Sequence, residues 1–345
     1  MTAAVLTGIR GMELRELPTP EITQPGDVKI RVTTVGVCGS DIHYYTTGRI
    51  GSQVIQFPYA VGHECAGIVE EVGPGVTRVK PGDRIAVDPA ISCFECDQCL
   101  AGRSHTCRKL LFLGCPGQVP GCLSEYLVMP QESCYRLPQD LSLTQAALSE
   151  PLAIGVYAVH RSVPMAGAKV GILGGGPIGL CVLANAVSEG AAAVYVTDKI
   201  DDRLSMARNA GAAWTGNPDR QDVVADLSAL EPLGLDVVFE CCGQQSAMDE
   251  AVQMLKPGGK LMLVGIPEEN RVSFSIDQLR RKEICIQNVR RQEGCVQETL
   301  DKMASGRLDV DFLVTHRFPL ERVKEAFDLV AAYGDGVVKA MIDVA

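Results

Sequence analysis

The sequence predicts an α/β protein of two domains, a mostly-β domain followed by a domain built on a doubly wound parallel sheet. Three observations lead to this prediction. The chain has 345 residues, of which 46% are hydrophobic, enough to fill two cores. Short strand patterns broken by turns occupy the chain before Ala146, whereas from Lys169 onward strand patterns alternate with helical ones.

Composition and charge narrow the classes of partner. The formal net charge is −10 and the chain has no block of Lys and Arg, so we expect no nucleic-acid partner. The N-terminus lacks a basic region followed by an apolar one, and no window approaches 18 unbroken apolar residues. We therefore expect no membrane partner and a cytoplasmic location.

The first domain begins with strands of alternating character. Polar and apolar residues alternate over 27–32, and residues 67–72 lead into a Gly-Pro-Gly turn. A second turn at 79–84 precedes the short strand 85–87. These segments predict a barrel-like β scaffold whose loops carry the chemistry.

A metal site is predicted within this scaffold. Cys38, His63 and Glu64 supply a thiolate, an imidazole and a carboxylate, and Ser40 and His43 follow the cysteine closely. Three protein ligands with one open position are typical of catalytic zinc. The alternative is a buried cysteine beside a strand and a His-Glu pair that caps a turn.

Four of the fourteen cysteines lie in one short segment, which we expect to form a lobe over 91–109. Cys93, Cys96, Cys99 and Cys107 have the spacing of a closed, four-thiolate structural zinc site. Two local disulfides are the alternative, but a reducing compartment and the geometry of such short loops argue against them.

An isolated charge stands in the apolar helix expected over 146–159. Glu150 must there be paired, protonated or linked to a metal, because an unpaired buried charge is costly. It is a candidate for the surroundings of the zinc. A glutamate favoured by the dipole at a helix start is the other interpretation.

The second domain opens with a glycine-rich turn between the strand 170–173 and the helix 180–187. In this G-x-G-x-x-G pattern the glycines permit a tight bend, a close approach to a pyrophosphate and packing of helix on strand. The expected cofactor-binding residues of the turn are Gly174, Gly176, Pro177, Ile178 and Gly179. Its place between a strand and a helix predicts dinucleotide binding.

The next strand, 194–197, ends at Asp198, where an acid can bind the ribose hydroxyls. Its charge would repel a 2′-phosphate, which favours NAD over NADP. Lys199 and Arg203 follow it and belong to the same predicted site. Because both are cations, NADP stays an alternative. Later strands and helices are expected at 236–240, 260–264, 297–304, 312–318, 320–332 and 337–342.

These motifs together resemble the zinc-dependent medium-chain dehydrogenases along essentially the whole chain. The resemblance rests on the Gly36–Tyr44 segment, Gly62-His63-Glu64, the four cysteines, Glu150-Pro151 and the glycine-rich turn. It implies a GroES-like catalytic domain over 1–153, a Rossmann domain over 154–289 and a C-terminal segment, 290–345, that returns to the first domain. The Gly48–Gly51 and Leu313–Leu320 segments look most like the sorbitol and xylitol dehydrogenase branch.

Carried over residue by residue, the resemblance implies Cys38, His63 and Glu64 at the catalytic zinc, with Glu150 as a further ligand or as a partner of the metal's water. Ser40 and His43 have the spacing of the family's proton relay. Tyr44 and Arg290 resemble positions that contact substrate hydroxyls; a core tyrosine and a surface arginine are the alternatives.

The resemblance therefore implies oxidation of a polyol to a ketose, with NAD as the hydride acceptor and one catalytic and one structural zinc per chain. We also expect a homo-oligomer, a dimer or a tetramer. A dehydrogenase for threonine or a sugar acid is the alternative within the fold. A nucleotide-binding or structural protein without activity is the alternative of another class, although the intact metal set speaks against it.

Overall fold

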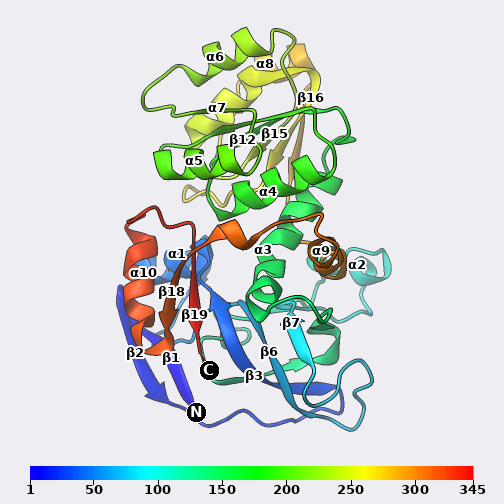
Figure 1. Cartoon of the computed structure of the whole chain (residues 1–345), viewed down its shortest axis with the longest axis vertical. Coiled ribbons are helices and arrows are strands. Elements are labelled where there is room, and N and C mark those ends of the chain that lie inside the picture. Colours follow the sequence, from blue (N-terminus) through cyan, green and yellow to red (C-terminus); the bar gives the residue numbers. More distant parts are fainter. Residues whose placement is uncertain (345) are drawn as a thin grey trace. The chain divides into compact units, whose positions relative to one another are not determined.

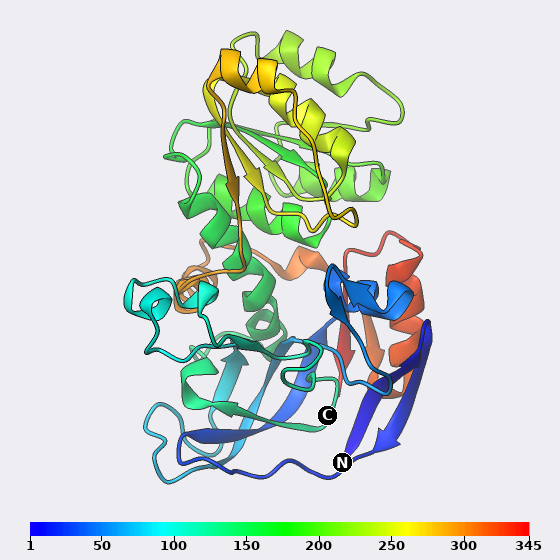
Figure 2. The same cartoon turned by 180° about the vertical axis from the view of Figure 1, so that it is seen from behind.

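The computed structural model describes residues 1–344, and the chain divides into two compact units (Figures 1 and 2). The first unit contains Met1–Glu150, Val296–Gly306 and the chain from Val310 onward. The second contains Pro151–Cys295 and Arg307–Asp309. Each unit has its own sheet, so the predicted α/β class, with a mostly-β part and a doubly wound part, is confirmed.

The first unit is built around a seven-stranded sheet with the order β11-β7-β6-β3-β19-β18, in which β10 also pairs with β3. Its N-terminal strands are β1 (Thr2–Gly8), β2 (Gly11–Glu16), β3 (Asp27–Gly36), β4 (Arg49–Ile50), β5 (Gln53–Val54), β6 (Glu64–Val72), β7 (Arg84–Val87), β8 (Ala90–Ile91), β9 (Leu111–Phe112), β10 (Tyr126–Pro130) and β11 (Cys134–Arg136). Its helices are α1 (Gly39–Thr47) and α2 (Asp97–Leu100), with 3₁₀ turns at Ser104–Thr106 and Gln131–Ser133.

The C-terminal part of the chain completes this sheet. It forms α9 (Cys295–Ala304), β18 (Val314–Pro319), α10 (Val323–Ala331) and β19 (Lys339–Asp343), with 3₁₀ turns at Asp311–Leu313 and Leu320–Arg322. Strand β19 pairs antiparallel with the end of β3 and parallel with β18. Residues more than 300 positions apart, such as Gly36 and Met341, thereby become neighbours.

The alternation in β3 explains how this sheet forms. Val28, Ile30 and Val32 are fully buried in the core, whereas Lys29 and Arg31 between them are partly exposed. One face of the strand therefore packs on apolar side chains while the other keeps contact with water, as a half-covered antiparallel sheet requires.

The second unit is a six-stranded, all-parallel sheet with the order β14-β13-β12-β15-β16-β17. Its elements in chain order are α3 (Leu143–His160), which begins in the first unit, β12 (Lys169–Leu173), α4 (Pro177–Ser188), β13 (Ala193–Thr197), α5 (Asp201–Asn209), β14 (Trp214–Gly216), α6 (Val223–Leu230), β15 (Leu235–Glu240), α7 (Gln245–Met254), β16 (Leu255–Leu263), α8 (Ile276–Lys282) and β17 (Cys285–Asn288).

The strand order reverses direction between β12 and β15, which are neighbours in the middle of the sheet. In open parallel sheets, ligands bind at the carboxyl ends of the strands beside such a reversal. The turn after β12 is the predicted glycine-rich turn. Within residues 1–344, none of the helices is both long enough and apolar enough to cross a membrane.

Candidate functional site

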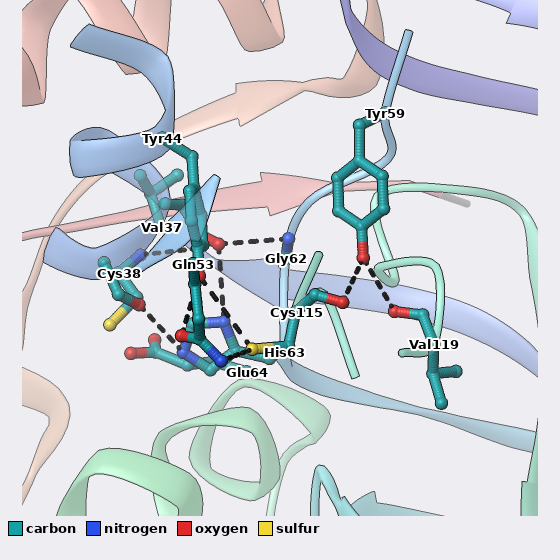
Figure 3. Close-up of polar contacts among 12 residues, drawn as sticks. Val37, Cys38, Tyr44, Gln53, Tyr59, Gly62, His63, Glu64, Cys115 and Val119 are labelled. Atoms are coloured by element: carbon teal, nitrogen blue, oxygen red, sulfur yellow. Dashed lines mark hydrogen bonds and ion pairs between the residues drawn. The ribbon is translucent and has the colours of Figure 1, made fainter. Parts of the chain in front are cut away.

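The register of two central strands brings the predicted catalytic ligands together. Strands β3 and β6 pair so that Gly36 lies opposite Glu64, and Cys38 follows β3 just as His63 precedes β6. One ligand atom each of Cys38, His63 and Glu64 lies within 4.8 Å of the others (Figure 3). A Cβ at position 36 would lie 2.3 Å from a carboxylate oxygen of Glu64, so any other residue there would displace this carboxylate. A thiol, an imidazole and a carboxylate in one partly buried group fit the donor set of catalytic zinc.

A buried aspartate fixes the orientation of the imidazole. Asp41, only 1% exposed, accepts hydrogen bonds from the backbone N–H groups of Cys38 (3.2 Å) and Gly62 (3.1 Å). Its Oδ1 also lies 3.3 Å from Nδ1 of His63. Burial by itself lowers the pKa of His63, but the charges of Asp41 and Cys38 outweigh it and raise that pKa. Because Asp41 contacts Nδ1, the other ring nitrogen, Nε2, is the one available as a ligand.

Glu64 forms a buried ion pair that joins the first and last parts of the chain. Both its oxygens accept hydrogen bonds from Nζ of Lys339, at 2.8 and 2.7 Å, and both side chains are at most 2% exposed. Lys339 also donates to the backbone carbonyl of Val37. If Glu64 binds a metal, its negative charge is therefore already balanced by the ammonium of Lys339.

Glu150 lies near this group without belonging to it. The group of Cys38, His63 and Glu64 does not include Glu150, although His63 and Glu64 both act on its charge. Burial is the largest cause that raises the pKa of Glu150 to about 7. The prediction that it is a direct ligand or a partner of the metal's water stays open.

The other predicted catalytic residues have varied surroundings. Oγ of Ser40 lies 3.5 Å from Nε2 of His63, but no hydrogen bond joins Ser40 to the half-buried His43 among the described residues. Tyr44 is buried, and its hydroxyl contacts Gln53 and Cys115. Arg290 is exposed and belongs to the second unit. The roles predicted for these residues stay predictions.

The four clustered cysteines form a compact set in the lobe between β8 and β9. Sγ of Cys96 lies 3.6 Å from that of Cys99 and 3.9 Å from that of Cys107, which is 3.4 Å from that of Cys93. Four sulfurs at a zinc–sulfur distance of about 2.3 Å in a tetrahedron are about 3.8 Å apart. The observed spacings match this value, and all four cysteines are free thiols, so the alternative of two disulfides is wrong.

The backbone of the lobe favours ionised sulfur at some positions only. N–H groups of Arg108 and Cys99 lower the pKa of Cys96 to about 6, whereas loss of solvent raises that of Cys99 to about 12. Two backbone N–H groups, of Cys93 and Lys109, point at the sulfur of Cys107 at 3.3 Å. A divalent cation is the partner that would allow all four thiolates to coexist.

In the second unit the glycine-rich turn has the expected shape. Gly174 has φ +102°, and Gly176 is the N-cap of α4 with Pro177 at the first helical position. A Cβ at Gly179 would lie 1.8 Å from the carbonyl oxygen of Gly174, so only glycine lets the helix approach the turn. Ile178 lies in the first turn of α4, whose N-terminus suits a phosphate.

Asp198 ties the end of β13 to this turn. Its carboxylate accepts hydrogen bonds from the backbone N–H groups of Gly175 (2.7 Å) and Ile200 (2.8 Å). Of the two neighbouring cations, Lys199 pairs with Asp219 at 2.9 Å, and Arg203 lies 3.9 Å from Asp198. The carboxylate and one cation thus lie next to the turn.

Three functional candidates were missed by the sequence analysis, namely Asp41, Lys339 and Glu240. Glu240 ends β15, is fully buried and accepts hydrogen bonds from the N–H groups of Cys242 and Gly243, beside the glycine-rich turn. Lys339 and Glu240 carry the signal that identified Glu150, a single charge in an apolar run. Asp41, in the first turn of α1, could have been found as a helix N-terminal acid.

Comparison with known proteins defines the family. Residues 24–139 match the family described as "Alcohol dehydrogenase GroES-like domain", and residues 177–305 match "Zinc-binding dehydrogenase". The chain belongs to the zinc-dependent medium-chain dehydrogenases. It is 36% identical to a sorbitol dehydrogenase of Bacillus subtilis (strain 168), over 99% of this chain and 97% of the relative. It is also 35% identical to an L-idonate 5-dehydrogenase of Vitis vinifera, over 99% and 94% of the two chains.

A solved structure extends this similarity to the fold. A protein assigned to the zinc-binding dehydrogenases of Sinorhizobium meliloti 1021, crystallised with NADP, superposes with a TM-score of 0.90 at 30% identity, over 99% of each chain. The predicted family, its GroES-like and Rossmann domains and the assignment as a dehydrogenase are therefore confirmed.

The buried pair of Glu64 and Lys339 leads to a stability prediction. Glu64→Gln removes the carboxylate that contacts the buried ammonium of Lys339, and Lys339→Met removes the ammonium that contacts the buried carboxylate of Glu64. We expect each to lower the free energy of unfolding by about 3–5 kcal/mol, and the double variant to lose less than the sum, because no lone charge remains. Denaturant titration of the four proteins measures this double-mutant cycle.

Glu325→Gln is the matched control, since it breaks an exposed ion pair with Arg322 in the same unit. It should change the denaturation midpoint little. Additive effects of the two buried substitutions would show that the pair is not energetically coupled.

Proposed function

We propose that this protein oxidises a secondary hydroxyl of a polyol to a ketone, with zinc at the group of Cys38, His63 and Glu64 and NAD as the hydride acceptor. The observation that carries the proposal is the similarity to a sorbitol dehydrogenase over 99% of the chain, with this donor group intact. A sugar alcohol of this kind is a neutral substrate. The polar groups beside the donors, Ser40 and Tyr44, are uncharged at neutral pH and suit it.

The donor residues and the residues that contact them have separate roles in this reaction. Zinc held by these donors would make an alcohol hydroxyl more acidic, and a bound nicotinamide would supply the hydride acceptor. Cys38, His63 and Glu64 hold the metal, Asp41 orients the imidazole, and Lys339 fixes the carboxylate. Their burial restricts water around the reacting oxygen.

Removal of the hydroxyl proton needs a route to solvent. Ser40, whose Oγ is 3.5 Å from His63, is the first group that can accept it, and the half-buried His43 is the next on the same helix. Because no hydrogen bond joins these two side chains, the route requires an intervening hydroxyl or water. Glu150, buried within reach of the charges of His63 and Glu64, is a second candidate for accepting the proton.

A substrate panel tests this function. We expect NAD reduction with one or more of sorbitol, xylitol, iditol, galactitol and ribitol, at a kcat/KM at least about tenfold above those for threonine and for sugar acids. The measurement is absorbance of NADH at saturating cofactor. No turnover of any polyol, together with good turnover of an aldonate, would refute the polyol assignment.

A sugar acid is the second candidate, because the L-idonate 5-dehydrogenase relative is 35% identical over 99% of the chain. Its carboxylate would need a cation near the reacting carbon. In the first unit Lys339 is already paired with Glu64, which favours the neutral polyol.

We propose two zinc ions per chain, one in each cysteine-containing group. Metal analysis of protein purified without added zinc should then give about two equivalents. Cys93→Ser should remove one without touching the catalytic group, whereas Cys38→Ser should remove the other and abolish turnover. Cys285→Ser, at an exposed cysteine outside both groups, is the control. A value near one that Cys93→Ser leaves unchanged would contradict the structural site.

We propose NAD rather than NADP because the carboxylate of Asp198, beside the glycine-rich turn, would repel a 2′-phosphate bound there. Asp198→Asn keeps an acceptor for the N–H of Gly175 but removes the charge. We expect its preference for NAD over NADP to fall by about tenfold or more, and Asp198→Ala to weaken NAD binding as well. Calorimetric titration with both cofactors measures this, and a wild-type protein that prefers NADP would refute the assignment.

We further propose a cytoplasmic homo-oligomer, a dimer or a tetramer. All fourteen cysteines lie within the described residues and are free thiols, as a reducing compartment would keep them.

A further inference from the structure

Two polar side chains in the first unit, Gln53 and Cys115, have no role in the chemistry proposed above and form a cluster with Tyr44. The carboxamide of Gln53 accepts a hydrogen bond from the hydroxyl of Tyr44 at 3.3 Å and donates one to the thiol of Cys115 at 3.0 Å. The Tyr44 hydroxyl also lies 3.9 Å from that thiol. Tyr44 and Cys115 are at most 5% exposed, whereas Gln53 is only partly buried.

This cluster lies next to the metal-binding group. Tyr44 follows Ser40 by one turn of α1, so the two share a face of the helix, and Ser40 contacts His63. Cys115 donates its N–H to the carbonyl of Phe112, whose ring centroid is 5.4 Å from that of His63. Figure 3 shows Tyr44, Gln53 and Cys115 on the same side of the first unit as Cys38, His63 and Glu64, and the contacts of Ser40 and Phe112 link the two groups.

The positions of these side chains are fixed by the backbone. Gln53 begins β5, which forms a two-stranded hairpin with β4, where it pairs with Ile50. The turn that carries Cys115 is held by Tyr59, whose hydroxyl donates to the carbonyl oxygens of Cys115 (2.6 Å) and Val119 (3.1 Å). The backbone therefore sets the positions of these polar groups, as a side chain that recognises a substrate requires.

The contacts of Gln53 with other described residues leave part of the hydrogen-bonding capacity of its carboxamide unused. An amide has two N–H donors and two acceptor lone pairs, and the two contacts above use one of each. Its N–H group donates to a thiol, which is a weak acceptor. A second hydroxyl on the substrate could accept the remaining N–H and donate to the remaining lone pair, which a simple alcohol could not do.

We propose that Gln53 is a specificity-determining residue that contacts a hydroxyl next to the reacting carbon of the polyol, with Tyr44 and Cys115 holding its carboxamide in place. The inference rests on the proposed function and deepens it. Gln53 is then the residue of this chain that distinguishes a polyol from a monohydric secondary alcohol.

The test compares Gln53→Met with the wild type, both loaded with zinc and NAD. Methionine has about the length of glutamine and no hydrogen-bonding amide. We expect kcat/KM for the best polyol of the panel to fall about 10- to 100-fold, mainly through KM. Zinc content, the dissociation constant for NAD and the rate with 2-butanol should stay within about twofold. Gln56→Met, at an exposed glutamine three residues along, is the matched control and should behave as the wild type.

Two results would overturn the inference. One is an unchanged kcat/KM for the polyol in Gln53→Met. The other is a loss that is equal for the polyol and for 2-butanol, or that accompanies loss of zinc, since either shows a general disturbance of the site. A wild-type protein without activity on any polyol is a different failure: it refutes the proposed function, and this inference with it.

Discussion

The buried ion pair between Glu64 and Lys339 is the interaction on which the organisation of the first unit depends. Its partners are 275 positions apart, and it forms only when β19 has paired with the end of β3. Burying either charge without the other would cost several kcal/mol. The chain therefore cannot assemble the metal-binding group around Glu64 without also placing its C-terminal strand, which couples completion of the sheet to completion of the site.

Around this pair the protein organises the candidate metal donors through residues outside the donor group. Asp41 receives hydrogen bonds from the backbone on either side of the group and holds one nitrogen of His63. Gly36 lets the carboxylate of Glu64 approach the neighbouring strand. The donors are thus set by a rigid shell before any ligand arrives, which reduces the cost of ordering them when zinc and substrate bind.

The two zinc-type groups differ in how they are built. The four cysteines lie within 15 positions of one another and are arranged by a short helix and two turns, with backbone N–H groups directed at sulfur. Cys38 lies just after β3 and His63 just before β6, so their approach depends on the register of the central sheet. A local group can form as soon as its loop closes, whereas a nonlocal one requires the folded domain. The local four-cysteine group is therefore suited to stabilise its loop, and the nonlocal group is suited to chemistry.

The sequence by itself determined the fold class, the family, the local cysteine lobe and the turn of the dinucleotide site, because each is encoded by periodicity or by spacing within a short segment. It also indicated Cys38, His63 and Glu64 as a donor set. Only the tertiary structure decided the partners of those donors. That Lys339 neutralises Glu64, and that Gln53 meets Cys115 across 62 positions, depends on strand register and on turns packed from distant segments. No local pattern carries such pairings, since the side chains that meet are chosen by the packing of the whole domain.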